Sequence, residues 1–206
     1  MAVEVVVEVG KRRTFASALD WPGWSRSGRD EEGALGALED YRGRYAAVLR
    51  VAGVTAVPRG GLTVVEHLVG DATTDFGAPS RPAAAEARAA ARAALTRQCG
   101  CLAACWAALG TAAAAAPAKL RKGPRGGGRD RDAIVAHVLA AEVAYGRKLG
   151  LGRDLDAEQR RQAMLDLLGR PRGRAVLERG WPARYALRRI AWHALDHAFE
   201  IEDKAG

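Results

Sequence analysis

The chain has 206 residues, of which 49% are hydrophobic and 27% charged. This balance is typical of a soluble globular protein, and the length provides a core for one large domain or two small ones. No run reaches the roughly 18 uninterrupted apolar residues of a membrane span, so we expect no membrane segment. The first residues, MAVEVVVEVG, contain two glutamates and no basic start, which does not fit a secretory signal peptide and favours a cytoplasmic location.

The formal net charge of +8 permits contact with nucleic acid or with acidic ligands. A nucleic-acid-binding protein usually interleaves aromatic residues with a basic face or carries a recognisable motif, and neither is present. We therefore expect the charge to serve general solubility and expect no nucleic-acid partner. The three cysteines, an odd number, fit a reducing compartment better than a disulfide framework.

The N-terminal part, residues 1–80, predicts a small α+β module. Its first residues alternate valine with glutamate, which is typical of a strand with one apolar side, and a second extended run, RRTFASALD, follows. Asp30 is placed to cap a helix that extends to Gly53. The segment from Leu62 predicts a further strand, so that the order is ββαβ.

Residues 81–206 are helical in pattern. An alanine-rich helix ends at Pro117, a second begins near Asp132, a third covers DAEQRRQAMLDLLG, and the last begins around Pro182, a residue suited to a first helical turn. Four consecutive helices of this length are best buried as a four-helix bundle. The predicted fold class is therefore α+β, a ββαβ module followed by a four-helix bundle.

Three of the four histidines fall on helical faces that read as core. His193 and His197 are one turn apart on the last helix, so their imidazoles can hold the same ion. His137 lies beside the apolar stripe of the second helix and can join them inside a bundle. Three neutral imidazoles suit Zn²⁺, Ni²⁺ or Fe²⁺ and leave a coordination position open for water or substrate. The alternative is that these are surface or hydrogen-bonded core histidines.

The stretch RYALRRIAWHALDHAFEIED, with IVAHVLAAE earlier, resembles the DinB superfamily of metal-dependent four-helix bundles. The resemblance implies that His137, His193 and His197 bind a divalent metal, Zn²⁺ first and Ni²⁺ or Fe²⁺ as alternatives. Known members include maleylpyruvate isomerases and S-transferases that use mycothiol or bacillithiol. It thus implies a transferase, isomerase or hydrolase that acts on a small anionic substrate, with a low-molecular-weight thiol as a further cofactor.

The earlier stretch RRTFASALDWPGWSRSGRDEEGALGAL is similar to the HicB antitoxin-type fold. In that family the fold binds a partner protein or pairs into dimers, so the resemblance implies a second function. The chain would then be a non-enzymatic regulatory or partner-binding protein, in which the bundle is a scaffold and a homodimer is one arrangement. A helical bundle stands where that family carries its DNA-binding segment.

Two further residues lie close to the histidines in helical register. Glu200 follows His197 by three residues and could orient a ligand imidazole, bind the metal, or act as the base in catalysis. A solvated carboxylate at the helix end is an equal alternative. Tyr145 lies two turns beyond His137 and could donate a hydrogen bond to a substrate, although a core tyrosine is the commoner case.

The loop KGPRGGGRDRD precedes the second helix and is rich in glycine and arginine. Arg125 and Arg129 bring positive charge to a helix N-terminus, which already favours anions, and could hold an anionic substrate or thiol. A flexible solvated linker is the alternative. We expect the cysteines in CGCLAAC to fill the core, His67 to be structural, and Asp196 to be exposed.

Overall fold

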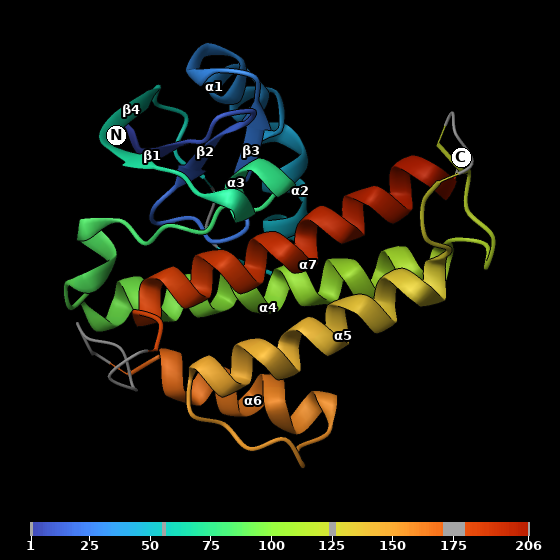
Figure 1. The fold of residues 1–206 in the computed structure, drawn as a ribbon. Helices are drawn as coiled ribbons and strands as arrows, with labels where there is room; N and C mark the ends of the chain where they lie inside the picture. Colours follow the sequence, from blue (N-terminus) through green and yellow to red (C-terminus); the bar gives the residue numbers. More distant parts are fainter. Residues whose placement is uncertain (1, 55–56, 124–126, 171–179, 206) are drawn as a thin grey trace.

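Strands form one four-stranded sheet in the N-terminal part of the chain, and long helices follow it (Figure 1). The computed structural model describes residues 2–54, 57–123, 127–170 and 180–205. In chain order the elements are β1 (Val3–Val9), β2 (Thr14–Ala18), β3 (Ser25–Gly28), α1 (Glu31–Asp40), α2 (Arg42–Val51), β4 (Leu62–Val69), α3 (Ala72–Phe76), η1, a 3₁₀ helix (Ala84–Ala87), α4 (Arg92–Ala115), α5 (Arg131–Lys148), α6 (Ala157–Leu168) and α7 (Ala183–Ala205).

The sheet has the order β3-β2-β1-β4, in which β1 pairs antiparallel with β2 and parallel with β4. The prediction of a strand at the N-terminus is confirmed. Glu8 lies on the side of β1 opposite Val7, as the alternation predicts, but this side is covered here and Glu8 is buried. Its carboxylate accepts hydrogen bonds from the Thr74 hydroxyl and from the backbone N–H groups of Ser80 and Arg81, and these bonds compensate its burial.

The predicted ββαβ order is wrong in two respects. A third strand, β3, pairs with β2, although its sequence SRSG has no apolar alternation. The single predicted helix is two helices, α1 and α2, which meet at Tyr41. The start of α1 is confirmed, because the Asp30 side chain accepts a hydrogen bond from the Gly33 backbone N–H over 2.8 Å.

The helices of the second part begin and end close to the predicted residues, with one exception. Asp156 caps α6 by accepting the Gln159 N–H, and α7 begins directly after Pro182. The exception is α4, which begins at Arg92, later than the alanine-rich sequence predicts. The alanine-rich residues before it form η1 and an extended connection instead. The fold is thus α+β, a four-stranded sheet followed by helices.

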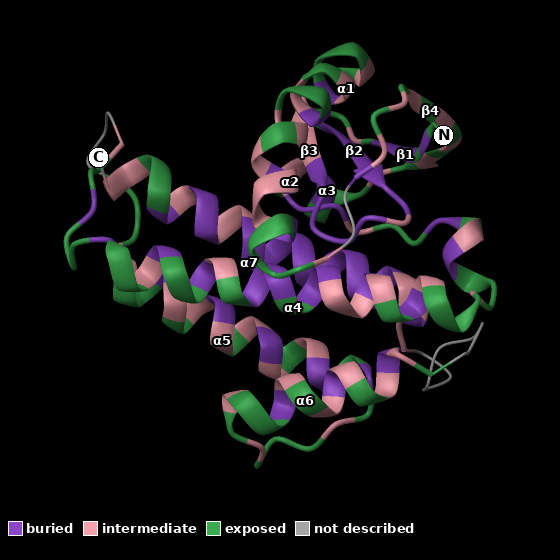
Figure 2. Cartoon of the chain, turned by 180° about the vertical axis from the view of Figure 1, so that it is seen from behind, coloured by how far each residue is buried: buried purple, intermediate pink, exposed green. Residues whose placement is uncertain are grey.

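The sheet part and the helices share a continuous core, which appears as the purple segments of Figure 2. Helix α7 lies along α4, and α5 and α6 pack on the other side of this pair, away from the sheet. Helix α4 is long and apolar enough to cross a membrane, a property that buried core helices of soluble proteins share. Buried side chains from both parts belong to this core, among them Val5, Leu38, Leu49, Leu102, Ile134, Met164 and Ile190.

An ion pair inside this core joins η1 to α7. The Arg188 guanidinium donates two hydrogen bonds to the Glu86 carboxylate, over 2.6 and 2.9 Å. Both side chains are 1% exposed or less. The same carboxylate accepts the Ala83 backbone N–H, so Glu86 holds the connection before α4 against α7.

Replacing Glu86 with alanine should lower the free energy of unfolding by about 3–5 kcal/mol, because it leaves a buried guanidinium without its partner. Chemical denaturation followed by circular dichroism measures this loss. Asp203→Ala, which removes one partner of the exposed Arg44 pair, is the control and should cost less than about 1 kcal/mol. Equal losses in the two variants would contradict the assigned role of the buried pair.

Candidate metal centre

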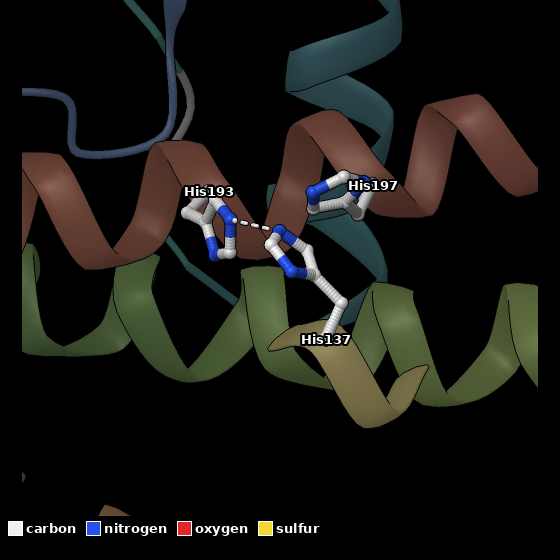
Figure 3. A group of neighbouring side chains, drawn as sticks. All are labelled: His137, His193 and His197. Atoms are coloured by element: carbon white, nitrogen blue, oxygen red, sulfur yellow. Dashed lines mark hydrogen bonds between the residues drawn. The ribbon is translucent and has the colours of Figure 1, made fainter. Parts of the chain in front are cut away.

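Helix α7 places two imidazoles on one edge and buries the neighbouring face against α4. Ile190 and Ile201 are buried in the core, whereas His193 and His197 project from the adjacent edge toward α5. His137 reaches them from α5, and Figure 3 shows the three rings turned toward one another. The predicted convergence of the three histidines is therefore found.

The separations of the nitrogen atoms fit a metal centre. His193 Nε2 and His137 Nε2 are 3.3 Å apart. Two nitrogen ligands of a tetrahedral zinc ion, each about 2.0–2.1 Å from it, are themselves separated by about 3.3 Å. The ligand atoms of all three rings lie within 4.8 Å of one another, so only small shifts bring the third nitrogen to the same distance.

The surroundings of the rings keep two of them neutral. Burial, together with the neighbouring His197, Arg189, His137 and Arg129, lowers the pKa of His193 to about 2. Burial, His197 and Arg129 also lower the pKa of His137. Neutral imidazoles present free lone pairs, which is the state that a metal ion requires.

Glu200 contacts the outer side of the histidine cluster. Its Oε2 lies 2.7 Å from His197 Nδ1, which leaves Nε2 of this ring to face the other two imidazoles. Its second oxygen accepts a hydrogen bond from Lys204. The bond from His197 lowers the pKa of Glu200 to about 2, so the carboxylate stays ionised. Of its predicted roles, this geometry favours orienting a ligand imidazole.

His193 is the most buried of the three rings, at 7% exposure. Its Nδ1 is enclosed and has no hydrogen-bond partner among residues 2–54, 57–123, 127–170 and 180–205. Its Nε2 faces only another imidazole. A divalent cation between the rings would compensate the lone pairs that meet there, so the donor set fits a metal.

Arg189, which the sequence reasoning did not single out, lies beside the imidazoles. Its guanidinium lies over the ring of Trp192 at 4.7 Å and over that of Tyr145 at 5.6 Å. The side chain is 9% exposed, and its Nη1 has no partner in the part of the chain that the structure describes. In the sequence, its position one turn before His193 on the same helix was the feature that indicated a place near the imidazoles.

Tyr145 was predicted to contact the substrate, and its ring lies 5.7 Å from that of His193 and 5.1 Å from that of Trp181. It therefore borders the centre. Of the loop arginines, Arg125 lies outside the described residues. Arg129 is exposed, and its charge contributes to the lowered pKa of both His137 and His193.

Other polar residues contact groups outside the centre. Asp196, which we expected to be exposed, is partly buried and accepts a hydrogen bond from Arg26 over 2.8 Å, because α7 packs against the sheet part here. His67 is exposed on β4 and lies 2.9 Å from Glu31. This imidazole is therefore separate from the other three.

Comparisons of the chain with models of known protein families, with curated proteins and with solved structures returned no match. The two family resemblances therefore stay predictions. What the chain does has to be inferred from the side chains at its candidate sites.

The cysteines are free thiols, and Cys101 and Cys105 are fully buried, as expected for residues that fill a core. Burial raises the pKa of Cys99 to about 11 and also raises the pKa of the other two. Thiols of such high pKa do not act as nucleophiles near neutral pH.

At about pH 8 the native chain should therefore react with a disulfide reagent such as DTNB at least about 100-fold more slowly than the chain unfolded in guanidinium, in which thiols ionise near pH 8.5. The absorbance of the released thiolate measures both rates. Rapid labelling of the native protein with one equivalent would show that Cys99 is activated.

Proposed function

We propose that the chain is a metal-dependent enzyme of the DinB type, in which His137, His193 and His197 hold one divalent cation. The observation that carries this proposal is the approach of three imidazoles from two helices. Zn²⁺ is the first candidate, because its tetrahedral geometry matches the separation of 3.3 Å, and Ni²⁺ or Fe²⁺ are alternatives. Three protein ligands leave a position for a reactant, as in catalytic rather than structural sites.

When bound, such an ion lowers the pKa of a water or thiol that it coordinates and polarises substrate oxygen atoms. The chain's own residues would do the rest. Glu200 fixes the tautomer and orientation of His197. Arg189 supplies a guanidinium with an unpaired N–H beside His193, and Arg129 adds positive charge at the exposed side. Tyr145, packed against Trp181 with ring centroids 5.1 Å apart, would cover one side of the centre.

This arrangement of positive charge around neutral ligands favours a small anionic substrate. Beside the predicted loop residues Arg125 and Arg129, we propose Arg189 as a further group for binding the anion, because its guanidinium lies over the rings of Tyr145 and Trp192 next to His193. A low-molecular-weight thiol would fit the same requirement, since its carboxylates pair with guanidinium and its sulfur binds divalent zinc. We therefore propose thiol transfer, isomerisation or hydrolysis as the reaction class.

Elemental analysis of the tag-free protein should find about one equivalent of Zn, Ni or Fe per chain. The double variant His193→Ala, His197→Ala should lose the metal and keep its circular dichroism spectrum. His67→Ala is the matched control, because its imidazole is exposed on β4 and far from the other rings in the fold. Absence of metal from the wild type after reconstitution would contradict the proposal.

Replacing Glu200 with glutamine should weaken metal binding by about 10–100-fold, because His197 loses the carboxylate that orients its ring. Competition with a chromophoric chelator measures the affinity. Glu202→Gln, a change of the same kind on α7 at a carboxylate that pairs with Arg44, should leave the affinity unchanged. Equal affinities in the two variants would show that Glu200 is only a surface carboxylate.

A second candidate is the partner-binding function that the HicB resemblance implies. The observation in its favour is the exposure of Val65 and Val69 on β4, with His67 between them, and of Val9, which pairs with Val69 from β1. Strand β4 is an edge strand, so its free backbone groups could pair with a second copy of the sheet. This function needs no metal, and the histidine variants would leave it intact.

A further inference from the structure

A mostly apolar groove of about 320 Å³ lies between α2, α4 and α7, a volume within the range of small-molecule sites. Val48 and Val51 of α2 form one wall, and Ala108 of α4 forms part of the other. Phe199 of α7 lies at one end. It follows His197 by two residues, a step of about 200° around the helix, and so projects from the far side of α7. The groove is therefore separate from the histidine cluster.

The groove stays open because the side chains on its two walls are too short to meet. Helix α2 packs against α4 and lines the groove with residues at the spacing i, i+3, i+4 and i+7 of one helix face, which are Arg44, Ala47, Val48 and Val51. The part of α4 that lines the groove consists of alanines and Thr111. Apolar surface is thus left uncovered, and Val51 is 88% exposed. Contiguous apolar surface in a hollow is typical of binding sites.

The charged residues at one end of the groove compensate one another. The Arg44 guanidinium lies 2.6 Å from the Glu202 carboxylate and 2.9 Å from that of Asp203. It also stacks on the Phe199 ring, 3.9 Å from the centroid. The Arg121 guanidinium donates to the backbone carbonyl of Asp203 over 2.7 Å, so two guanidinium groups meet two carboxylates here. A charged ligand would lose hydration at this end without gaining an unpaired opposite charge.

The volume of the groove sets the size of the molecule that fits. An apolar cavity of about 150 Å³ binds one benzene molecule, so about 320 Å³ accommodates about twelve carbon atoms. Thr111 is exposed at the border, and its hydroxyl can bond one uncharged polar group such as an alcohol. An uncharged, mostly apolar molecule therefore matches the walls, the charge and the volume of the groove.

We propose that this groove binds an uncharged apolar small molecule of about twelve carbon atoms, held between the valines of α2 and the alanines of α4 and against the Phe199 ring. A fatty carboxylate is disfavoured, because Arg44 is already paired with Glu202 and Asp203. An alkylammonium ion would have to displace Arg44 from the same two carboxylates. Such binding is separate from the proposed metal-dependent activity, since the described residues that line the groove include no histidine.

The test is a fluorescence titration of the full-length chain, in the presence of EDTA, with N-phenyl-1-naphthylamine, an uncharged probe that emits more strongly in apolar surroundings. Wild type should show saturable binding of about one equivalent. Octanol should displace the probe. Octanoate and octylammonium have the same chain length and should displace it about tenfold more weakly, because their charged groups lose hydration without gaining a partner.

Two pairs of variants locate the bound probe. Ala108→Phe places a ring inside the groove and should abolish saturable binding, while the melting temperature stays equal or rises because the ring fills empty space. Ala103→Phe is the same change at an exposed position of α4 outside the groove and should bind as wild type does. Val51→Asp should weaken binding several-fold, whereas Val69→Asp, at an exposed valine of β4, should leave it unchanged.

The proposal is overturned if wild type shows no saturable binding, if octanoate displaces the probe better than octanol, or if Ala108→Phe binds as wild type does. Loss of probe binding in the His193→Ala, His197→Ala variant would place the probe at the histidines and would also overturn it. Sedimentation equilibrium tests a protein occupant: a dimer that Val51→Asp converts to a monomer would show that a second copy covers the groove instead. Retained binding in the histidine variant supports the groove, even if elemental analysis finds no metal in the wild type.

Discussion

The packing of α7 against α4 and the sheet part is the constraint on which the histidine cluster depends. One face of α7 is buried in the common core, and the buried pair between Arg188 and Glu86 fixes its first turns to η1. A buried ion pair adds little stability compared with apolar side chains packed in the same place. Its two charged groups must stay together, however, because neither can be left without a partner in the core. The pair therefore fixes the orientation of α7 about its own axis. This orientation determines which side of the helix faces α5 and which faces the sheet.

The histidine cluster shows a local conflict that a structural explanation alone does not resolve. Three imidazoles lie together, two of them with lowered pKa, in surroundings to which Arg129 and Arg189 add positive charge. A core built only for stability would place apolar groups here, because neutral nitrogen atoms that face one another lose hydration and gain one weak hydrogen bond. A metal ion bound here would compensate this cost by using the lone pairs. The nearby guanidinium groups would then favour negative charge on its remaining ligand.

Local patterns in the sequence predicted those features that depend on neighbours in the chain. The cap of α1 at Asp30, the position of α6 after Asp156 and the histidine spacing on α7 are of this kind. Features set by distant partners were missed. Strand β3 exists because β2 offers backbone groups for pairing, and Glu8 is buried because Thr74 and Ser80 bind its carboxylate. Neither interaction leaves a periodic pattern in the sequence, and the same holds for the surroundings of Arg189.

Neighbouring edges of the same two turns of α7 meet different parts of the fold. His193 and His197 face α5, whereas Trp192 and Asp196, each one residue earlier, contact Phe15 of β2 and Arg26 of β3. A step of one residue rotates the side chain by about 100° around the helix, so both pairs stand one turn apart on neighbouring edges. The rings of Trp192 and His193 lie with their centroids 6.0 Å apart. Because these turns are part of one helix, a shift of α7 that tightens the imidazoles also moves the contacts of Trp192 and Asp196 with β2 and β3.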